Sequence, residues 1–217
     1  MDLLEFARGP VLYGSLMLFL LGTLWRLSGV LFMRYRSDLS KPRRTDTFWG
    51  GTRTVFTRFW PRREFFAATR FQLVMAYTFH IGLAVVVFFF VPHIEFIEGL
   101  LGIAWPGLSN DIILLAGALT VGALLAMLIR RLGNPTLRLI SRFDDYFSWL
   151  VTILPVATGL MAYAHLGPRY ETMLAIHILS VSLLFAWFPF GKLMHAVLFV
   201  PSRALTGASF ERKGVRA

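Results

Sequence analysis

The sequence contains no cysteine. A chain without thiolates cannot hold an iron–sulfur cluster through cysteine, form a disulfide or attach a c-type haem through a CxxCH motif. If this chain moves electrons, its cofactor must therefore be held by histidine. Any iron–sulfur cluster would have to belong to a partner.

Charged residues are also scarce, and one sign dominates. Only 16% of the 217 residues are charged, with 22 Lys and Arg against 12 Asp and Glu, while 56% are hydrophobic. The mean hydropathy is +0.63. This balance is typical of a polytopic membrane domain and not of a water-soluble fold. The opening MDLLEFARGP lacks a basic leading stretch, so we expect no cleaved signal peptide.

Five apolar stretches are long enough to cross a bilayer as helices. They cover residues 10–33, 71–92, 111–131, 145–166 and 171–199. The sequence therefore predicts an all-α integral membrane protein, with residues 1–217 forming one five-helix transmembrane domain. Pro189 lies inside the fifth stretch and is expected to kink it.

The basic residues predict the orientation, because cytoplasmic loops of membrane proteins are enriched in Lys and Arg. They gather in the segment 34–70, between the third and fourth stretches, and in the tail: Arg34, Arg36, Lys41, Arg43, Arg44, Arg53, Arg58, Arg62, Arg63, Arg70, Arg130, Arg131, Arg138, Arg142, Arg203, Arg212, Lys213 and Arg216. The opposite side carries only Arg8 and Arg169 among several acids. We therefore expect the N-terminus outside and the C-terminus in the cytoplasm.

The cytoplasmic segment 34–70 interleaves its arginines with aromatic residues, among them Trp49, Phe56 and Trp60. Two interpretations remain open for it. Anionic lipid attracts basic juxtamembrane segments, which favours a helix on the membrane surface. Aromatic residues with arginine are also enriched at interface cores, which favours a docking surface for a soluble subunit. Nucleic acid is not an expected partner, because these aromatics adjoin apolar spans.

Two histidines mark the fifth stretch. His177 and His195 are 18 residues apart, which is five turns of an α-helix. On one unbroken helix both rings would leave the same face, about 27 Å apart. Ionisable side chains inside membranes are costly and usually functional. Two inert, hydrogen-bonded histidines remain the alternative.

His80 in the second stretch lies in the inner half of the membrane in this topology, as His195 does. Two imidazoles at like depth on neighbouring helices are what bis-histidine ligation of a haem requires. We therefore expect haem b between the second and fifth helices, with His80 and His195 as ligands. An inert contact between helices is the alternative.

On the outer side, His177 could pair with either His93 or His165. His93 follows His80 on the same stretch, and Pro92 could redirect it toward the fifth helix, so His93 is favoured. His165 ends the fourth stretch at similar depth and is the substitute. Each could instead be a solvated histidine at the membrane edge.

Polar residues inside the spans have simpler interpretations. Arg26 and Lys192 lie near the inner surface, where haem propionates could neutralise them or where they could extend to the headgroups. The hydroxyls of Thr120, Thr152 and Thr158 are expected to bond to local backbone.

Several motifs together resemble a known family. They are LLGTLWRL in the first span, FHIG around His80, RRLGNPTLR followed by Asp145, IHILSVSLLFAWFPFGKLMH, and VPSRALT. The chain resembles the gamma subunit of respiratory nitrate reductase and the related membrane cytochromes b of sulfite-reductase-associated and heterodisulfide-reductase-type complexes. The resemblance covers most of the chain. It places His80 and His195 on the inner haem ligands and His177 on one outer ligand. The family's remaining outer histidine is replaced by Phe90, and its quinone-site lysine has no counterpart at the start of the third span.

The resemblance implies a bacterial or archaeal subunit of the cytoplasmic (inner) membrane with one or two haems b. Such a subunit transfers electrons between membrane quinone, menaquinone or ubiquinone, and a cytoplasmic iron–sulfur subunit. It would be part of an oxidoreductase complex without holding the terminal catalytic centre. The alternative is a haem-free membrane anchor that tethers a soluble enzyme.

Overall fold

The computed structural model describes residues 2–33 and 38–215, and within these ranges every regular element is helical. Five helical segments are long and apolar enough to cross a membrane: Leu3–Leu31, Arg63–Phe89, Asn110–Gly133, Phe143–Tyr163 and Tyr170–Trp187. They correspond to the five predicted stretches, so the prediction of an all-α protein with five candidate membrane helices is confirmed. Arg34, Arg36 and Arg216, which we assigned to the cytoplasmic side, lie outside the described residues.

The first candidate span is not one regular helix. It consists of α1 (Leu3–Phe6), a π-helical turn η1 (Ala7–Val11) and α2 (Leu12–Leu31). At Gly9 the backbone leaves helical geometry, with φ −93° and ψ −107°. Pro10 follows directly, and its missing N–H removes one helical hydrogen bond. The span therefore begins earlier than predicted and is kinked near its start.

The prediction of one fifth helix over 171–199 is wrong. Helix α9 (Tyr170–Trp187) ends before Pro189, a short 3₁₀ turn η2 (Lys192–Met194) follows, and α10 (His195–Arg212) begins at the histidine. Proline cannot donate to the helical ladder, and its ring clashes with the preceding turn. Here the result is a complete break and not the expected kink. His177 and His195 thus lie on different helices, and the five-turn argument that put them on one face fails.

Contacts divide the chain into two compact units. Unit 1 comprises residues 1–16 and 69–187, and unit 2 comprises residues 17–68 and 188–217. Each unit is described by itself below. The prediction that 1–217 acts as one haem-binding domain stays a prediction.

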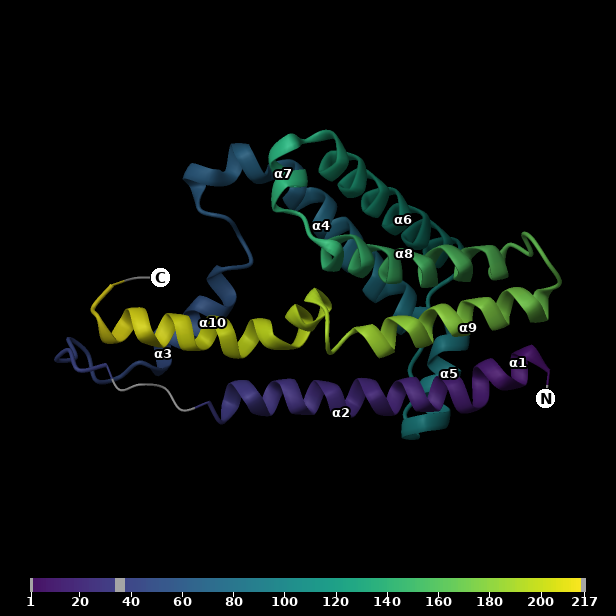
Figure 1. Cartoon of the computed structure of the whole chain (residues 1–217), viewed down its shortest axis with the longest axis horizontal. Coiled ribbons are helices and arrows are strands. Elements are labelled where there is room, and N and C mark those ends of the chain that lie inside the picture. Colours follow the sequence, from purple (N-terminus) through teal and green to yellow (C-terminus); the bar gives the residue numbers. More distant parts are fainter. Residues whose placement is uncertain (1, 34–37, 216–217) are drawn as a thin grey trace. The chain divides into compact units, whose positions relative to one another are not determined.

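In unit 1, helix α8 (Phe143–Tyr163) packs beside α9 and also against α6 (Asn110–Gly133), as Figure 1 shows. The indole of Trp187 donates to Ser148 Oγ at 2.9 Å, and that of Trp149 donates to the carbonyl of Leu124 at 2.8 Å. Helix α4 (Arg63–Phe89) meets α6 at Gly82, where an added Cβ would lie 2.9 Å from the Ala116 carbonyl. These close approaches are those of packed membrane helices, which use small residues where backbones meet.

The threonine hydroxyls behave as expected. Each hydroxyl donates to the backbone carbonyl one turn earlier at a distance of 2.7 Å: Thr120 to Ala116, Thr152 to Ser148 and Thr158 to Leu154. This prediction is confirmed.

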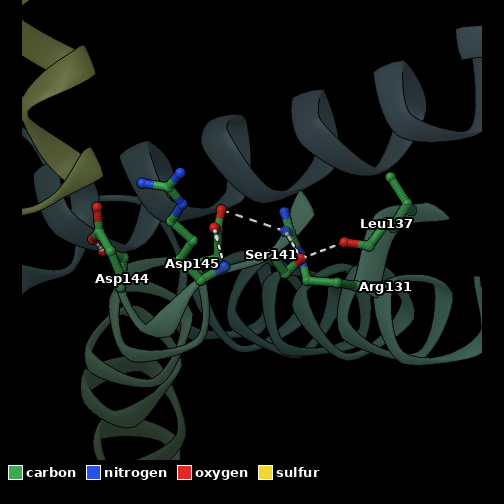
Figure 2. Close-up of polar contacts among 7 residues, drawn as sticks. Arg131, Leu137, Ser141, Asp144 and Asp145 are labelled. Carbon is green, nitrogen blue, oxygen red and sulfur yellow. Dashed lines mark hydrogen bonds and ion pairs between the residues drawn. The ribbon is translucent and has the colours of Figure 1, made fainter. Parts of the chain in front are cut away.

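The motif RRLGNPTLR forms a polar corner between α6, the short helix α7 (Pro135–Ile140) and α8. Figure 2 shows Arg131 between Asp145, at 3.3 Å, and Ser141, at 2.6 Å. Asp145 also accepts the backbone N–H of Arg142 at 3.0 Å, which caps α8. Asn134 caps α7 by accepting from the Leu137 N–H. These contacts explain the motif structurally, since caps satisfy the orphan N–H groups of helix starts.

In unit 2, helix α3 (Phe48–Thr57) lies along α10 (Figure 1). The crossing is tight: a Cβ on Gly207 would come within 2.3 Å of the Gly50 carbonyl, and one on Gly51 within 2.9 Å of the Ala204 carbonyl. Arg44 pairs with Glu211, and the guanidinium of Arg203 lies 4.8 Å from the centre of the Phe59 ring. The predicted segment 34–70 therefore contains a folded helix, and α4 begins within it at Arg63.

The turn between α9 and η2 also packs within unit 2. The ring of Pro189 is fully buried and sits against Gly22 of α2, where a Cβ would approach it to 2.7 Å. Phe188 packs edge-on against Phe19, with ring centroids 5.0 Å apart. The residues of the helix break thus pack against α2.

Candidate histidine sites

His93 is placed by a second proline-linked break. Helix α4 ends at Phe89, Phe90 is extended (φ −80°, ψ 124°), and α5 (Val91–Leu101) begins with Pro92 in its first turn. Proline is favoured there, because the first-turn N–H groups have no helical partner. The break folds His93 back on α4, so that its Nδ1 lies 2.9 Å from the carbonyl oxygen of Val86. A carbonyl can only accept, so Nδ1 carries the proton and Nε2 the lone pair.

His177 is oriented in the same way by α8. Its Nδ1 donates to the carbonyl of Pro155 at 3.0 Å and lies 3.3 Å from the hydroxyl of Thr158. Gly159 makes room for the ring, since a Cβ there would stand 3.1 Å from His177 Cε1. Ser180 completes the cluster by bonding to Thr158 at 3.1 Å. The ring of His177 is thus fixed with Nε2 as its lone-pair nitrogen.

The two rings lie together. Their centroids are 6.2 Å apart and their planes differ by 16°. Two imidazoles that share one metal ion on opposite sides, each with a metal–nitrogen distance of about 2 Å, have centroids roughly 6 Å apart. The observed centroid separation is close to this value.

Two imidazole nitrogens are the number of protein ligands that a bis-histidine haem would take. Within residues 2–33 and 38–215 no group of three or more His, Cys, Asp or Glu could hold a metal ion. A haem brings four ligands of its own and needs only two from the protein. Metal-binding histidines generally donate their other N–H to a carbonyl or carboxylate, as both of these do. Burial also lowers the pKa of His93, which keeps this imidazole neutral and able to bind metal.

His165, the substitute, is placed differently. It follows α8 with a positive φ of 53°, is exposed, and stacks on Tyr170 with ring centroids 5.4 Å apart. The ring beside His177 is that of His93. Whether His93 and His177 bind iron stays a prediction, but the structure brings them together.

The predicted inner ligands fall in different units, so their mutual position is not described. His80 is exposed on α4, with Nδ1 2.7 Å from the Ala76 carbonyl. His195 opens α10, with Nδ1 2.8 Å from the Lys192 carbonyl. Both rings are therefore held in the tautomer seen at His93 and His177. Their pairing around an inner haem stays a prediction.

The suggested propionate partners both belong to unit 2. Arg26 is exposed on α2, and Lys192 is exposed at the start of η2. The Lys192 carbonyl orients His195. For both residues, contact with a haem propionate stays a prediction.

A comparison with known proteins finds a relative over nearly the full length. The chain is 30% identical over 222 residues to a protein of Nitratidesulfovibrio vulgaris strain Hildenborough, with 96% of this chain and 93% of the relative covered. The chain belongs to the family of that protein. The relative's name states no activity. No family model and no solved structure matches the chain.

Sequence reasoning missed the residues of α8 that hold His177. The Pro155 carbonyl accepts from His177 Nδ1, the Thr158 hydroxyl lies beside the same nitrogen, and Gly159 leaves space for the ring. A proline inside an apolar span, followed three and four residues later by threonine and glycine, was the available signal. It could not show which helix the cluster faces.

Proposed function

We propose that this chain is a membrane cytochrome b subunit that transfers electrons within a respiratory oxidoreductase complex. The observation that carries the proposal is the His93–His177 pair: two nearly parallel imidazoles 6.2 Å apart, each with Nδ1 bonded to a carbonyl. A haem bound there would supply an iron that accepts and releases one electron at a time.

The chain's own residues would do the rest. The carbonyls of Val86 and Pro155 accept the two Nδ1 protons, so each Nε2 lone pair would be available to bind the haem iron. Apolar residues of α4, α8 and α9 would limit the access of water to the haem, and its potential would depend on this burial and on the ligands.

The wider scheme follows the family resemblance. His80 and His195 would hold an inner haem on the cytoplasmic side, with the N-terminus outside and the C-terminus inside. Electrons would pass between membrane quinone (menaquinone or ubiquinone) and a cytoplasmic iron–sulfur subunit, in a bacterial or archaeal inner membrane. The absence of cysteine supports this division, because clusters must come from the partner.

A haem-free anchor is the second candidate function, and unit 2 favours it. The α3–α10 pair, tied by the Arg44–Glu211 bridge and the Arg203–Phe59 contact, forms a compact basic body that could bind a soluble enzyme without any cofactor.

A reduced-minus-oxidised difference spectrum of the purified chain separates the two. A cytochrome b gives a b-type band, and haem extraction should give two haems per polypeptide if both sites are filled. One haem, unchanged in His177→Ala, would remove the outer site from the proposal. If the chain is fully inserted in the membrane and shows no haem band, the haem-free anchor is the function that remains.

A further inference from the structure

Helix α3 of unit 2 presents a largely exposed aromatic face. Trp49 is 70% exposed and Phe56 is 66% exposed, and Arg53 is exposed between them. At 100° per residue these three side chains fall within about 60° of one another on the helix. We call Trp49, Arg53 and Phe56 the outer face of α3.

The opposite face is already fully used. Gly50, Gly51 and Thr54 are buried against α10, with the Gly50 and Ala204 carbonyls at the closest approach. Thr54 donates to the Gly50 carbonyl at 2.7 Å. The orientation of α3 on α10 is thus fixed by backbone contact, and the outer face must point away from α10.

The chain length limits how far α3 can be from the membrane. Five residues, 58–62, separate the end of α3 from the start of α4, the second candidate span. Five residues cover at most about 20 Å when fully extended. Trp60, within this tether, is itself 67% exposed. The end of α3 can therefore lie no more than about 20 Å from the first residue of that candidate span.

We propose that the outer face of α3 lies on anionic phospholipid, so that α3 is an interfacial helix in the plane of the bilayer surface. Tryptophan is enriched at the membrane interface because its ring suits the headgroup level. Arginine beside it attracts anionic headgroups, and its aliphatic stem lies along apolar surface. A helix with such a face binds in the plane of the interface with its aromatic side chains at the acyl boundary.

The absence of cysteine permits a direct test on the full chain, because a single introduced thiol is the only one present. Phe56→Cys and, separately, Trp49→Cys are spin-labelled in vesicles of phosphatidylcholine with phosphatidylglycerol. Leu39→Cys, at a position 95% exposed in the same unit, is the control. Collision with oxygen, which concentrates in lipid, is compared with collision with a water-soluble nickel chelate.

We expect labels on the outer face to collide readily with oxygen and several-fold less with the nickel chelate than the Leu39 label does. Arg53→Gln should raise the access of the nickel chelate to the label at position 56, because one arginine contributes about fivefold to the affinity of a segment for anionic lipid. Vesicles of phosphatidylcholine alone should have the same effect, because they carry no anionic headgroups. Nickel access equal to that of the Leu39 label would place the face in water and overturn the proposal. Low access to both reagents would mean that protein covers the face, which overturns it equally.

Discussion

At the residue scale, the most informative side chains are those that orient histidines. Each of the four histidines proposed as ligands bonds through Nδ1 to a backbone carbonyl: Val86 for His93, Pro155 for His177, Ala76 for His80 and Lys192 for His195. Sequence spacing could nominate these residues by depth in the membrane. It could not give the tautomers, because they depend on which carbonyl each ring reaches.

The choice between the two outer histidines leads to a prediction. His93→Ala should remove one haem per polypeptide, because the imidazole beside His177 is lost. His165→Ala should leave the haem content unchanged, because its ring stacks on Tyr170. Pyridine haemochrome assay on matched preparations measures both. Loss of haem in the His165 variant alone would reverse the assignment.

Thr158 should tune the outer haem without holding it. Its hydroxyl lies 3.3 Å from His177 Nδ1, so Thr158→Val removes one of two acceptors and makes the imidazole a weaker electron donor to iron. The midpoint potential should rise by roughly 20–60 mV, the equivalent of one hydrogen bond of about 0.5–1.5 kcal/mol. A redox titration followed at the b-type band measures the shift. Haem content should stay constant, and a variant that loses haem would show that Thr158 is needed for folding of the site.

At the element scale, the predicted helix boundaries differ most from the structure next to prolines. Pro92 lies in the first turn of α5, directly after the end of the second span. This agrees with the prediction that Pro92 redirects the chain at His93. Pro189 has a larger effect than a kink, because α9 ends before it and Gly191 and the 3₁₀ turn follow. The apolar run continues through the break to Phe199, so hydropathy alone extended the helix too far. The packing of Pro189 against Gly22 is a tertiary contact, which local sequence patterns do not predict.

The contact between α3 and α10 should depend on Gly207. A leucine there would drive a Cβ within 2.3 Å of the Gly50 carbonyl, and overpacking of this kind costs about 1–3 kcal/mol. We expect Gly207→Leu to separate α3 from α10 and to speed tryptic cleavage at Arg58 and Arg62. Gly29→Ala, at a helical glycine with nothing within 4 Å, is the control. Equal cleavage rates in the two variants would show that α3 is held by other contacts.

At the scale of the whole molecule, the +10 net charge gathers on the predicted cytoplasmic side, and not all of it is available to a partner. Arg44 is paired with Glu211, and Arg212 donates to the carbonyls of Asp38 and Ser40. The side chains of Arg44 and Arg212 thus stabilise unit 2. The backbone N–H of Arg43 also donates to the Arg212 carbonyl at 2.9 Å, a contact that does not involve the Arg43 side chain. Arg62 and Arg63, by contrast, are exposed at the start of α4.

We therefore predict that a soluble iron–sulfur subunit binds largely through exposed arginines such as Arg62 and Arg63. Reversing both to glutamate should weaken the complex, and added salt should do the same, because the Debye length falls from about 10 Å at 0.1 M to about 3 Å at 1 M. Co-purification from detergent at the two salt concentrations measures the loss. Arg44→Glu needs separate treatment, because it breaks the bridge to Glu211 and disturbs unit 2 itself. The charge-swapped pair Arg44→Glu with Glu211→Arg restores that bridge and serves as the folding control. If the complex withstands both high salt and the double reversal, apolar contacts hold the partner and the basic surface has another role.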